Sequence, residues 1–124
     1  MKAVKINKDV PLDSKGNNEN IKFRIIKEDA MKACGFGHTY GKWIYSLGIT
    51  DTISLNITIN DDCSGEIQIL DEDFMQPYDF QGMILEKGDK TNATALTVQK
   101  RVYSILNDFS FMGIINGWNY GDYI

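Results

Sequence analysis

Three aromatic side chains lie close together in the segment 71–81, which is too polar to be simple core. They are Phe74, Tyr78 and Phe80, grouped around Pro77. Flat rings stack on nucleobases, and the free amides at a helix N-terminus bind phosphates. The segment is therefore a candidate nucleotide-binding site. The alternative is that each ring only fastens the loop onto a sheet.

Two adjacent basic residues are candidates for holding the phosphates of such a ligand. Lys100 and Arg101 lie off the apolar stripe of a predicted helix, where they can form charge-assisted hydrogen bonds. Their alternative role is plain surface solvation. Arg24 lies on the side of a predicted strand opposite its apolar residues, so it faces solvent, a ligand or a partner.

The residues of types used in catalysis do not form a recognisable catalytic or metal-binding motif. The segment 35–41 has three glycines, but the third comes one place too late for a dinucleotide-binding fingerprint, so we interpret the segment as a flexible turn. His38 is the single histidine, which leaves the usual triads without a general base. A zinc site would need Cys34 and Cys63 to converge on it. We expect no catalytic residue and no metal site.

The carboxylates form two short runs that do not resemble a calcium loop. Asp61-Asp62 and Asp71-Glu72-Asp73 lack its alternating oxygen ligands, so we interpret the first as a solvated turn and the second as the cap at a helix entry. The chain also shows no serine nucleophile elbow and no phosphate-binding loop. We expect a protein that is not an enzyme and uses no cofactor.

Length and composition bound the class of protein. With 124 residues, 43% of them apolar, the chain is expected to form one domain over residues 1–124. Thirteen basic against seventeen acidic residues give a net charge of −4, which argues against binding to nucleic acid. No apolar run approaches the roughly 18 residues of a membrane helix, and no signal peptide precedes the two unpaired cysteines. We expect a cytoplasmic protein without membrane contact.

Strand-type sequence dominates the middle of the chain. Segments 43–49, 52–60 and 65–70 are rich in β-branched and aromatic residues and are separated by polar turns. Alternating isoleucines on both sides of residues 61–65 predict an antiparallel hairpin. A further strand is predicted over 21–26, where apolar residues also alternate.

The longest helix is predicted from apolar residues at steps of three and four. This stripe consists of Ala95, Val98, Val102, Ile105 and Phe109. Asp89, Thr91 or Asn92 is expected to cap the start of the helix. A short helix is compatible with 80–86, and the tail 113–124 is expected to be a packed irregular segment or a last strand. The prediction is an α+β fold, an antiparallel meander of about four to six strands with this long amphipathic helix and room for a second short one.

The C-terminal half of the chain resembles a known family. The string LDEDFMQPYDFQ, the amphipathic helix, and an ending that contains GII-x-GW and GDYI are similar to small phage-encoded proteins. Among these the chain most resembles the Thoeris anti-defence proteins, sponges that sequester the cyclic ADP-ribose signals made by TIR-domain enzymes. The resemblance covers residues 65–124, and the N-terminal half matches only in general character.

The resemblance implies a protein that binds a cyclised nucleotide without cleaving it. The pockets would lie at subunit contacts of a homo-oligomer built from dimers, which extends to a hexamer or ring. Relatives also hold cyclic dinucleotides at a separate site. By position, the resemblance implies that one of the three clustered rings stacks on the base, with Asn92 at the helix start and Arg24 and Arg101 on the pyrophosphate.

Two functions are compatible with this sequence in the cytoplasm of an infected bacterial cell. The first is a sponge that sequesters the messenger, so that its potency is limited by stoichiometry. The alternative is an acidic, protein-binding inhibitor of a bacterial defence complex, whose carboxylates imitate nucleic acid. A small enzyme that cleaves the messenger ranks last, because its acid and base groups form no recognisable arrangement.

We predict a stable homo-oligomer, because the aromatic residues near strand edges and the C-terminus offer more apolar surface than a small core absorbs. These residues are Trp43, Trp118, Tyr120 and Tyr123. Light scattering at micromolar protein concentration should give a mass well above the 14.1 kDa of one chain. A monomer mass would contradict the prediction and weaken the expectation of pockets at subunit contacts.

Overall fold

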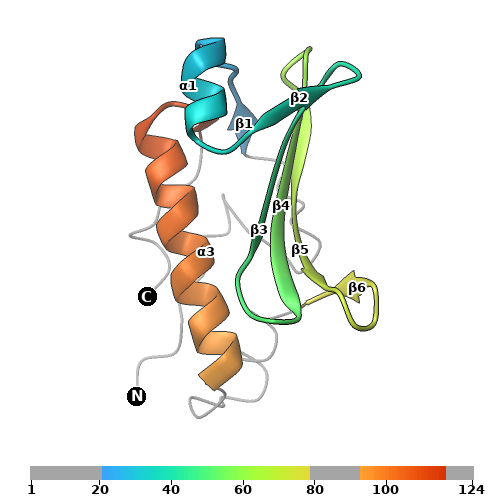
Figure 1. Ribbon diagram of the computed structural model, residues 1–124. Coiled ribbons are helices and arrows are strands. Elements are labelled where there is room, and N and C mark those ends of the chain that lie inside the picture. The colour runs from blue at the N-terminus through green and yellow to red at the C-terminus, as the bar shows by residue number, and fades with distance from the viewer. Residues whose placement is uncertain (1–20, 79–92, 117–124) are drawn as a thin grey trace.

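The computed structural model of the chain describes residues 21–78 and 93–116 (Figure 1). These residues form an α+β fold, as predicted, in which the long helix lies along one face of a sheet. The elements in chain order are β1 (Lys22–Phe23), α1 (Glu28–Ala33), β2 (Gly37–Thr39), β3 (Lys42–Gly48), β4 (Ile53–Asn60), β5 (Gly65–Asp71), β6 (Gln76–Pro77), α3 (Ala93–Phe111) and β7 (Ile115–Asn116).

The main sheet is a five-stranded meander with the order β2-β3-β4-β5-β6. Every neighbouring pair is antiparallel, so the predicted meander is confirmed. In the register, Ile57 at the centre of β4 stands opposite Tyr45 on β3 and Ile67 on β5. Because side chains alternate between the two faces of a strand, this register places one apolar row of each strand on the same face.

The turn between β4 and β5 is the predicted polar hairpin loop. The carboxylate of Asp62 accepts hydrogen bonds from the backbone N–H and from the hydroxyl of Ser64, at 2.9 and 2.5 Å. These bonds favour the ionised carboxylate, so they lower the pKa of Asp62. Between these bonds Cys63 has φ 69°, a backbone conformation that residues other than glycine rarely adopt.

The segment 35–41 is more ordered than the flexible turn expected from its glycines. Residues 37–39 are strand β2, paired with β3 so that Thr39 faces Lys42. The two residues between them, Tyr40 and Gly41, have φ of 48° and 74°. A two-residue loop with both φ values positive matches the twist of a hairpin, which is why the glycine is needed at this position.

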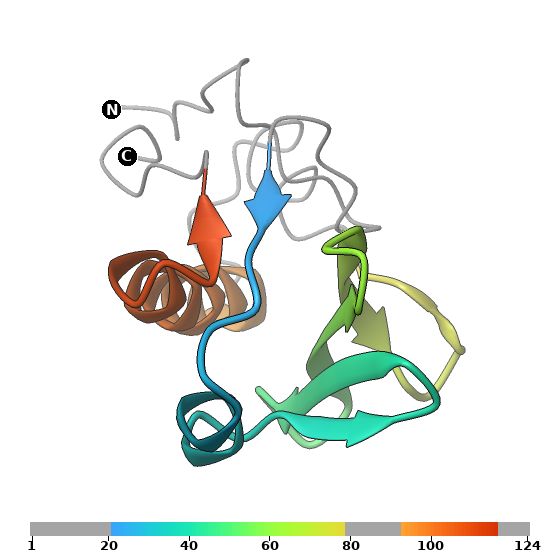
Figure 2. The ribbon, with the colours of Figure 1, turned by 90° about the horizontal axis from the view of Figure 1, so that it is seen from above.

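The core lies between the sheet and α3, and Figure 2 looks along the axis of α3 with the sheet beside it. The buried residues of α3 include four members of the predicted stripe, Ala95, Val98, Val102 and Phe109. The fifth, Ile105, is only partly buried, and its neighbour Leu106 is fully buried in its place. The helix is therefore rotated slightly from the orientation that the spacing alone suggested.

The predicted strand 21–26 is shorter in the structure. Only β1 pairs, with β7 as its antiparallel partner. The described pairs are Lys22 with Asn116 and Phe23 with Ile115. The next contact is the backbone N–H of Arg24, which donates to the carbonyl of Ile114 at 2.9 Å. Of the tail predicted over 113–124, residues 115–116 form β7, a last strand, and residues 117–124 lie outside the described residues.

The second helix of the described residues is α1, which is stabilised by an ion pair between Glu28 and Lys32 at 2.9 Å. The short helix expected over 80–86 lies outside the described residues. No helix in the described part of the chain combines the length and the apolar character that a bilayer span requires. Trp43, expected to offer exposed aromatic surface, is buried in the core, whereas Trp118, Tyr120 and Tyr123 lie outside the described residues.

We predict that the two faces of the sheet respond differently to the same substitution. Ile57→Ala empties a fully buried position and should lower the free energy of unfolding by about 2–5 kcal/mol. Ile44 lies on the open face and is 38% exposed, so Ile44→Ala should cost about 1 kcal/mol or less. Urea denaturation followed by circular dichroism measures both, and equal losses would show that the faces are wrongly assigned.

Candidate functional site

Phe74 lies at the tip of the hairpin that joins β5 to β6. The ladder closes where Asp71 faces Gln76, which leaves residues 72–75 as the loop. The carboxylate of Asp71 accepts a hydrogen bond from the backbone N–H of Asp73 at 3.1 Å. The acidic run 71–73 is therefore a hairpin turn, and the expected helix-entry cap is wrong. After this turn the chain returns to the sheet as β6, which pairs with β5.

The hairpin loop presents apolar side chains to solvent. Phe74 and its neighbour Met75 are each 73% exposed, and Met75 has φ 49°. The backbone N–H of Glu72 donates to the carbonyl of Thr52 at 2.8 Å, which ties the loop to the turn between β3 and β4. The ring of Phe74 is thus held outside the core on a fixed backbone.

Tyr78 occupies a different environment although it follows Phe74 by four residues. Its backbone N–H donates to the carbonyl of Ile69 at 2.9 Å, and its side chain is only 8% exposed. Burial raises the pKa of its phenol, and the negative charge of Asp71 raises it further. This ring packs into the core in the way that the fastening alternative requires. Phe80, the third predicted ring, lies outside the described residues.

The two predicted phosphate-binding arginines occupy separate parts of the fold. Arg101 lies on α3, and its guanidinium donates to the backbone carbonyl of Ile49, the residue that follows β3. Arg24 is exposed beside Ile114, beyond the C-terminal end of α3. Ten helical residues separate Arg101 from Phe111 at that end, a rise of about 15 Å. Asn92 lies outside the described residues.

Within residues 21–78 and 93–116, no hydrogen bond, ion pair or ring contact joins any two of Phe74, Tyr78, Arg24 and Arg101. The described part of one chain therefore does not assemble the predicted set into one compact site. A ligand that uses Phe74 together with an arginine has to span the gap or bind between two copies of the chain.

A polar cluster that the sequence analysis did not single out lies where β2 and β3 meet the turn after β4. His38 Nε2 lies 3.0 Å from Asp61 Oδ1, and the His38 ring lies 4.5 Å from the ring of Trp43, centroid to centroid. His38 and Trp43 are opposite each other in the β2–β3 ladder, which the two-residue turn between them fixes. The sequence signal for this contact is the two-residue turn, which predicts that His38 and Trp43 lie opposite each other.

The groups around the His38–Asp61 pair do not form a catalytic or metal-binding arrangement within the described residues. An imidazole hydrogen-bonded to a carboxylate can act as a general base, but it needs a nucleophile or another group from which to take a proton. Both side chains are exposed, and within the described ranges no three His, Cys, Asp or Glu side chains are grouped to hold a metal ion. The pair links two hairpins at the end of the sheet that also carries α1.

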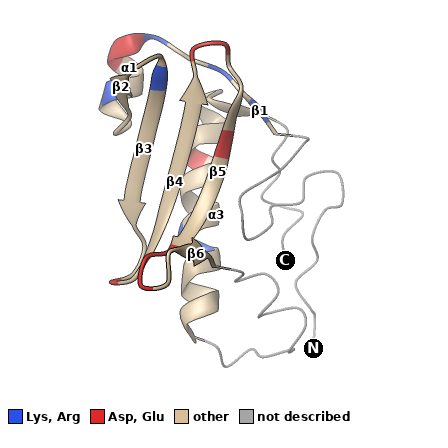
Figure 3. Cartoon of the chain, turned by 90° about the vertical axis from the view of Figure 1, so that its right-hand side faces the viewer, with Lys and Arg blue, Asp and Glu red and all other residues tan. Residues whose placement is uncertain are grey.

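Most carboxylates of the open face lie in the turns at its two ends, while Glu66 lies on β5 and the basic Lys42 begins β3 (Figure 3). Asn56 on β4 accepts a hydrogen bond from Ser46 at 2.6 Å and donates one to Ser54 at 3.0 Å, so these polar groups satisfy one another. The carboxylates in the turns include Asp51 between β3 and β4 and the pair 61–62 at the opposite end.

Comparisons of the chain with protein-family models, with curated proteins and with solved structures gave no match.

We predict opposite stability effects for the two described rings of the candidate site. Phe74→Ala removes a side chain that solvent already surrounds, so the free energy of unfolding should change by no more than about 0.5 kcal/mol. Tyr78→Ala leaves a cavity in the core and should cost about 3–5 kcal/mol. Thermal and urea unfolding measure both. A large loss for Phe74→Ala would show that its ring packs against the protein.

Proposed function

We propose that the protein is a non-catalytic binding protein that sequesters a cyclic nucleotide messenger, a cyclic ADP-ribose isomer, and serves as a phage anti-defence sponge in the infected bacterial cell. The observation that carries the proposal is the exposed Phe74 ring on a loop fixed by hydrogen bonds. The family resemblance of residues 65–124 suggests the class of ligand.

A ring that is exposed before the ligand arrives is suited to stacking on a base. Because the loop backbone is already fixed, little conformational entropy is lost when a base covers Phe74. Stacking of a base on an aromatic ring contributes about 1–3 kcal/mol. The neighbouring Met75 adds apolar surface that the same ligand would cover.

The charges around Phe74 indicate that the phosphates of the ligand bind elsewhere. Asp71, Glu72 and Asp73 directly precede the ring, and carboxylates repel a phosphate. The cation that complements the phosphates is Arg101, on another element. A site that takes its ring from one copy and its cation from another fits the homo-oligomer expected for this protein. Sequestration then needs affinity alone, and no bond of the ligand is broken.

One observation favours the alternative, an acidic protein-binding inhibitor. The turns at both ends of the open face carry carboxylates while the strands between them are largely uncharged (Figure 3). Such a surface is complementary to a basic protein surface, which is how an acidic protein imitates nucleic acid. This function would use the acidic turns and would not depend on the Phe74 ring.

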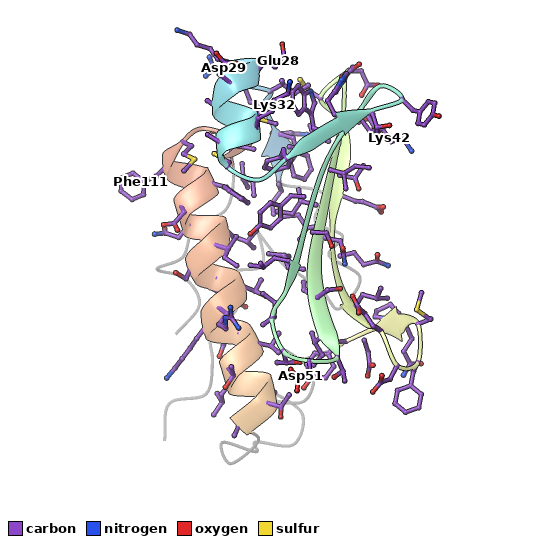
Figure 4. All side chains as sticks on the ribbon, in the orientation of Figure 1. Glu28, Asp29, Lys32, Lys42, Asp51 and Phe111 are labelled. Carbon is purple, nitrogen blue, oxygen red and sulfur yellow. The ribbon has the colours of Figure 1, made fainter. Side chains whose placement is uncertain are left out.

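We predict that the protein retains the messenger and releases it unchanged. The protein is incubated with a cyclic ADP-ribose isomer, filtered, and denatured by heat, and the released compound is identified by chromatography. Phe74→Ala should reduce retention at least roughly fivefold if stacking contributes about 1–3 kcal/mol. Phe111→Ala is the matched control, because Phe111 is 89% exposed at the far end of α3 and points away from the molecule (Figure 4).

The three outcomes of this assay separate the hypotheses. Recovery of the intact messenger supports a sponge. Recovery of linear ADP-ribose instead identifies an enzyme and contradicts the proposal. A lack of retention also contradicts it and leaves the acidic inhibitor as the better interpretation.

A further inference from the structure

The ends of the two described helices bring two sulfur atoms into contact. Cys34 is the C-cap of α1, and Met112 directly follows α3, whose C-terminal end lies beside α1 (Figure 1). The thiol of Cys34 donates to the thioether of Met112, with Sγ and Sδ 3.2 Å apart. The two residues are 78 positions apart in the sequence, so it is the fold that brings them together.

Both sulfur residues are held by the same helix-ending motif. Gly35 and Gly113 follow them directly, with φ of 101° and 82°. The residue after each glycine donates its backbone N–H to the carbonyl five positions earlier, at 3.1 and 3.0 Å, which is the Schellman pattern. The backbone of each sulfur residue is therefore fixed, while the thioether can still move on its flexible side chain.

The sulfur pair is accessible from solvent. Met112 is 48% exposed, and Cys34 is partly buried against the core. An ion can therefore reach both sulfur atoms without opening the core. The other cysteine, Cys63, is exposed in the turn between β4 and β5, and its sulfur forms no side-chain contact with the described residues. Of the two cysteines, Cys34 is thus the one that is paired with a second sulfur.

We propose that Cys34 and Met112 bind a soft monovalent metal ion, Cu(I). Thiolate and thioether are the soft ligands that select Cu(I). On binding, the Cys34 thiol releases its proton to solvent and a sulfur–copper bond replaces the S–H bond, with no change in the oxidation state of copper. The pair does not suit Zn(II), which takes four ligands, because no three His, Cys, Asp or Glu side chains are grouped within the described ranges.

The distance between the two sulfur atoms needs only a small adjustment to admit the ion. With metal–sulfur bonds of about 2.3 Å, two ligands of a three-coordinate ion lie about 4 Å apart. The sulfur atoms therefore have to separate by roughly 0.8 Å from their present 3.2 Å, which rotation within the Met112 side chain allows. The remaining position of the ion is left to solvent or to an external ligand. This inference is independent of the proposed function, since neither residue belongs to the candidate site.

The test measures the affinity for Cu(I) under anaerobic conditions, by competition with a coloured Cu(I) chelator. Cys34→Ser and Met112→Leu should each weaken binding at least tenfold, because loss of even an outer-shell partner of a metal costs about 10–100-fold. The matched controls are Cys63→Ser for the thiol and Met75→Leu for the thioether, since both residues are exposed in hairpin turns. Each control should change the affinity by less than about twofold, because neither removes a ligand.

A second measurement uses the unmodified protein, so the test does not depend on the folding of the variants, which circular dichroism checks. With the methionine methyl groups isotopically labelled, Cu(I) should shift the NMR signal of Met112 and leave that of Met75 in place. The inference is overturned by a lack of Cu(I) binding, an unshifted Met112 signal, an unchanged affinity in Met112→Leu, or an equal loss in Cys63→Ser. Displacement of Cu(I) by an excess of Zn(II) would also overturn it.

Discussion

The burial of β4 between its two neighbours and under α3 is the constraint on which the rest of the structure depends. Leu55, Ile57 and Ile59 on this strand have no exposed surface, and each faces an inward side chain of β3. Burying such side chains stabilises a fold by about 1.5–3 kcal/mol each. A shift of one residue in the register would turn all of them to solvent. The positions of the turns, and hence of the Phe74 loop, follow from this register.

Alternation and helical spacing were sufficient to predict the central strands, the hairpin between β4 and β5, and α3, because these patterns report burial within a single element. These patterns did not predict the features that depend on packing or pairing with a segment distant in the sequence. Of the strand predicted over 21–26, the described residues pair only as β1, with the distant β7 as partner, and Leu106 replaced Ile105 in the core because packing sets the rotation of α3. The hairpin after Asp71 depends on pairing with β6.

The candidate site was predictable in its residue types and not in its arrangement. Phe74 and Tyr78 are similar in the sequence, but only one of them faces solvent, since hairpin geometry decides which ring enters the core. The contact between Arg101 and Ile49 joins residues 52 positions apart, and that between His38 and Asp61 joins residues 23 apart. No local pattern encodes contacts over such separations. A binding function in which ring and cation are separated is consistent with this arrangement.

The two outermost strands of the sheet restrict how copies of the chain can associate. Within the described residues β2 has three residues and β6 has two, and they pair with residues 42–44 of β3 and 70–71 of β5. Short edge strands are one of the ways in which proteins prevent open-ended strand addition. Edge-to-edge strand addition extends the sheet from copy to copy and forms fibres, whereas contact through side chains on a sheet face or helix does not extend the sheet. Within the described residues, the brevity of β2 and β6 therefore disfavours growth of the sheet by strand addition along these two strands.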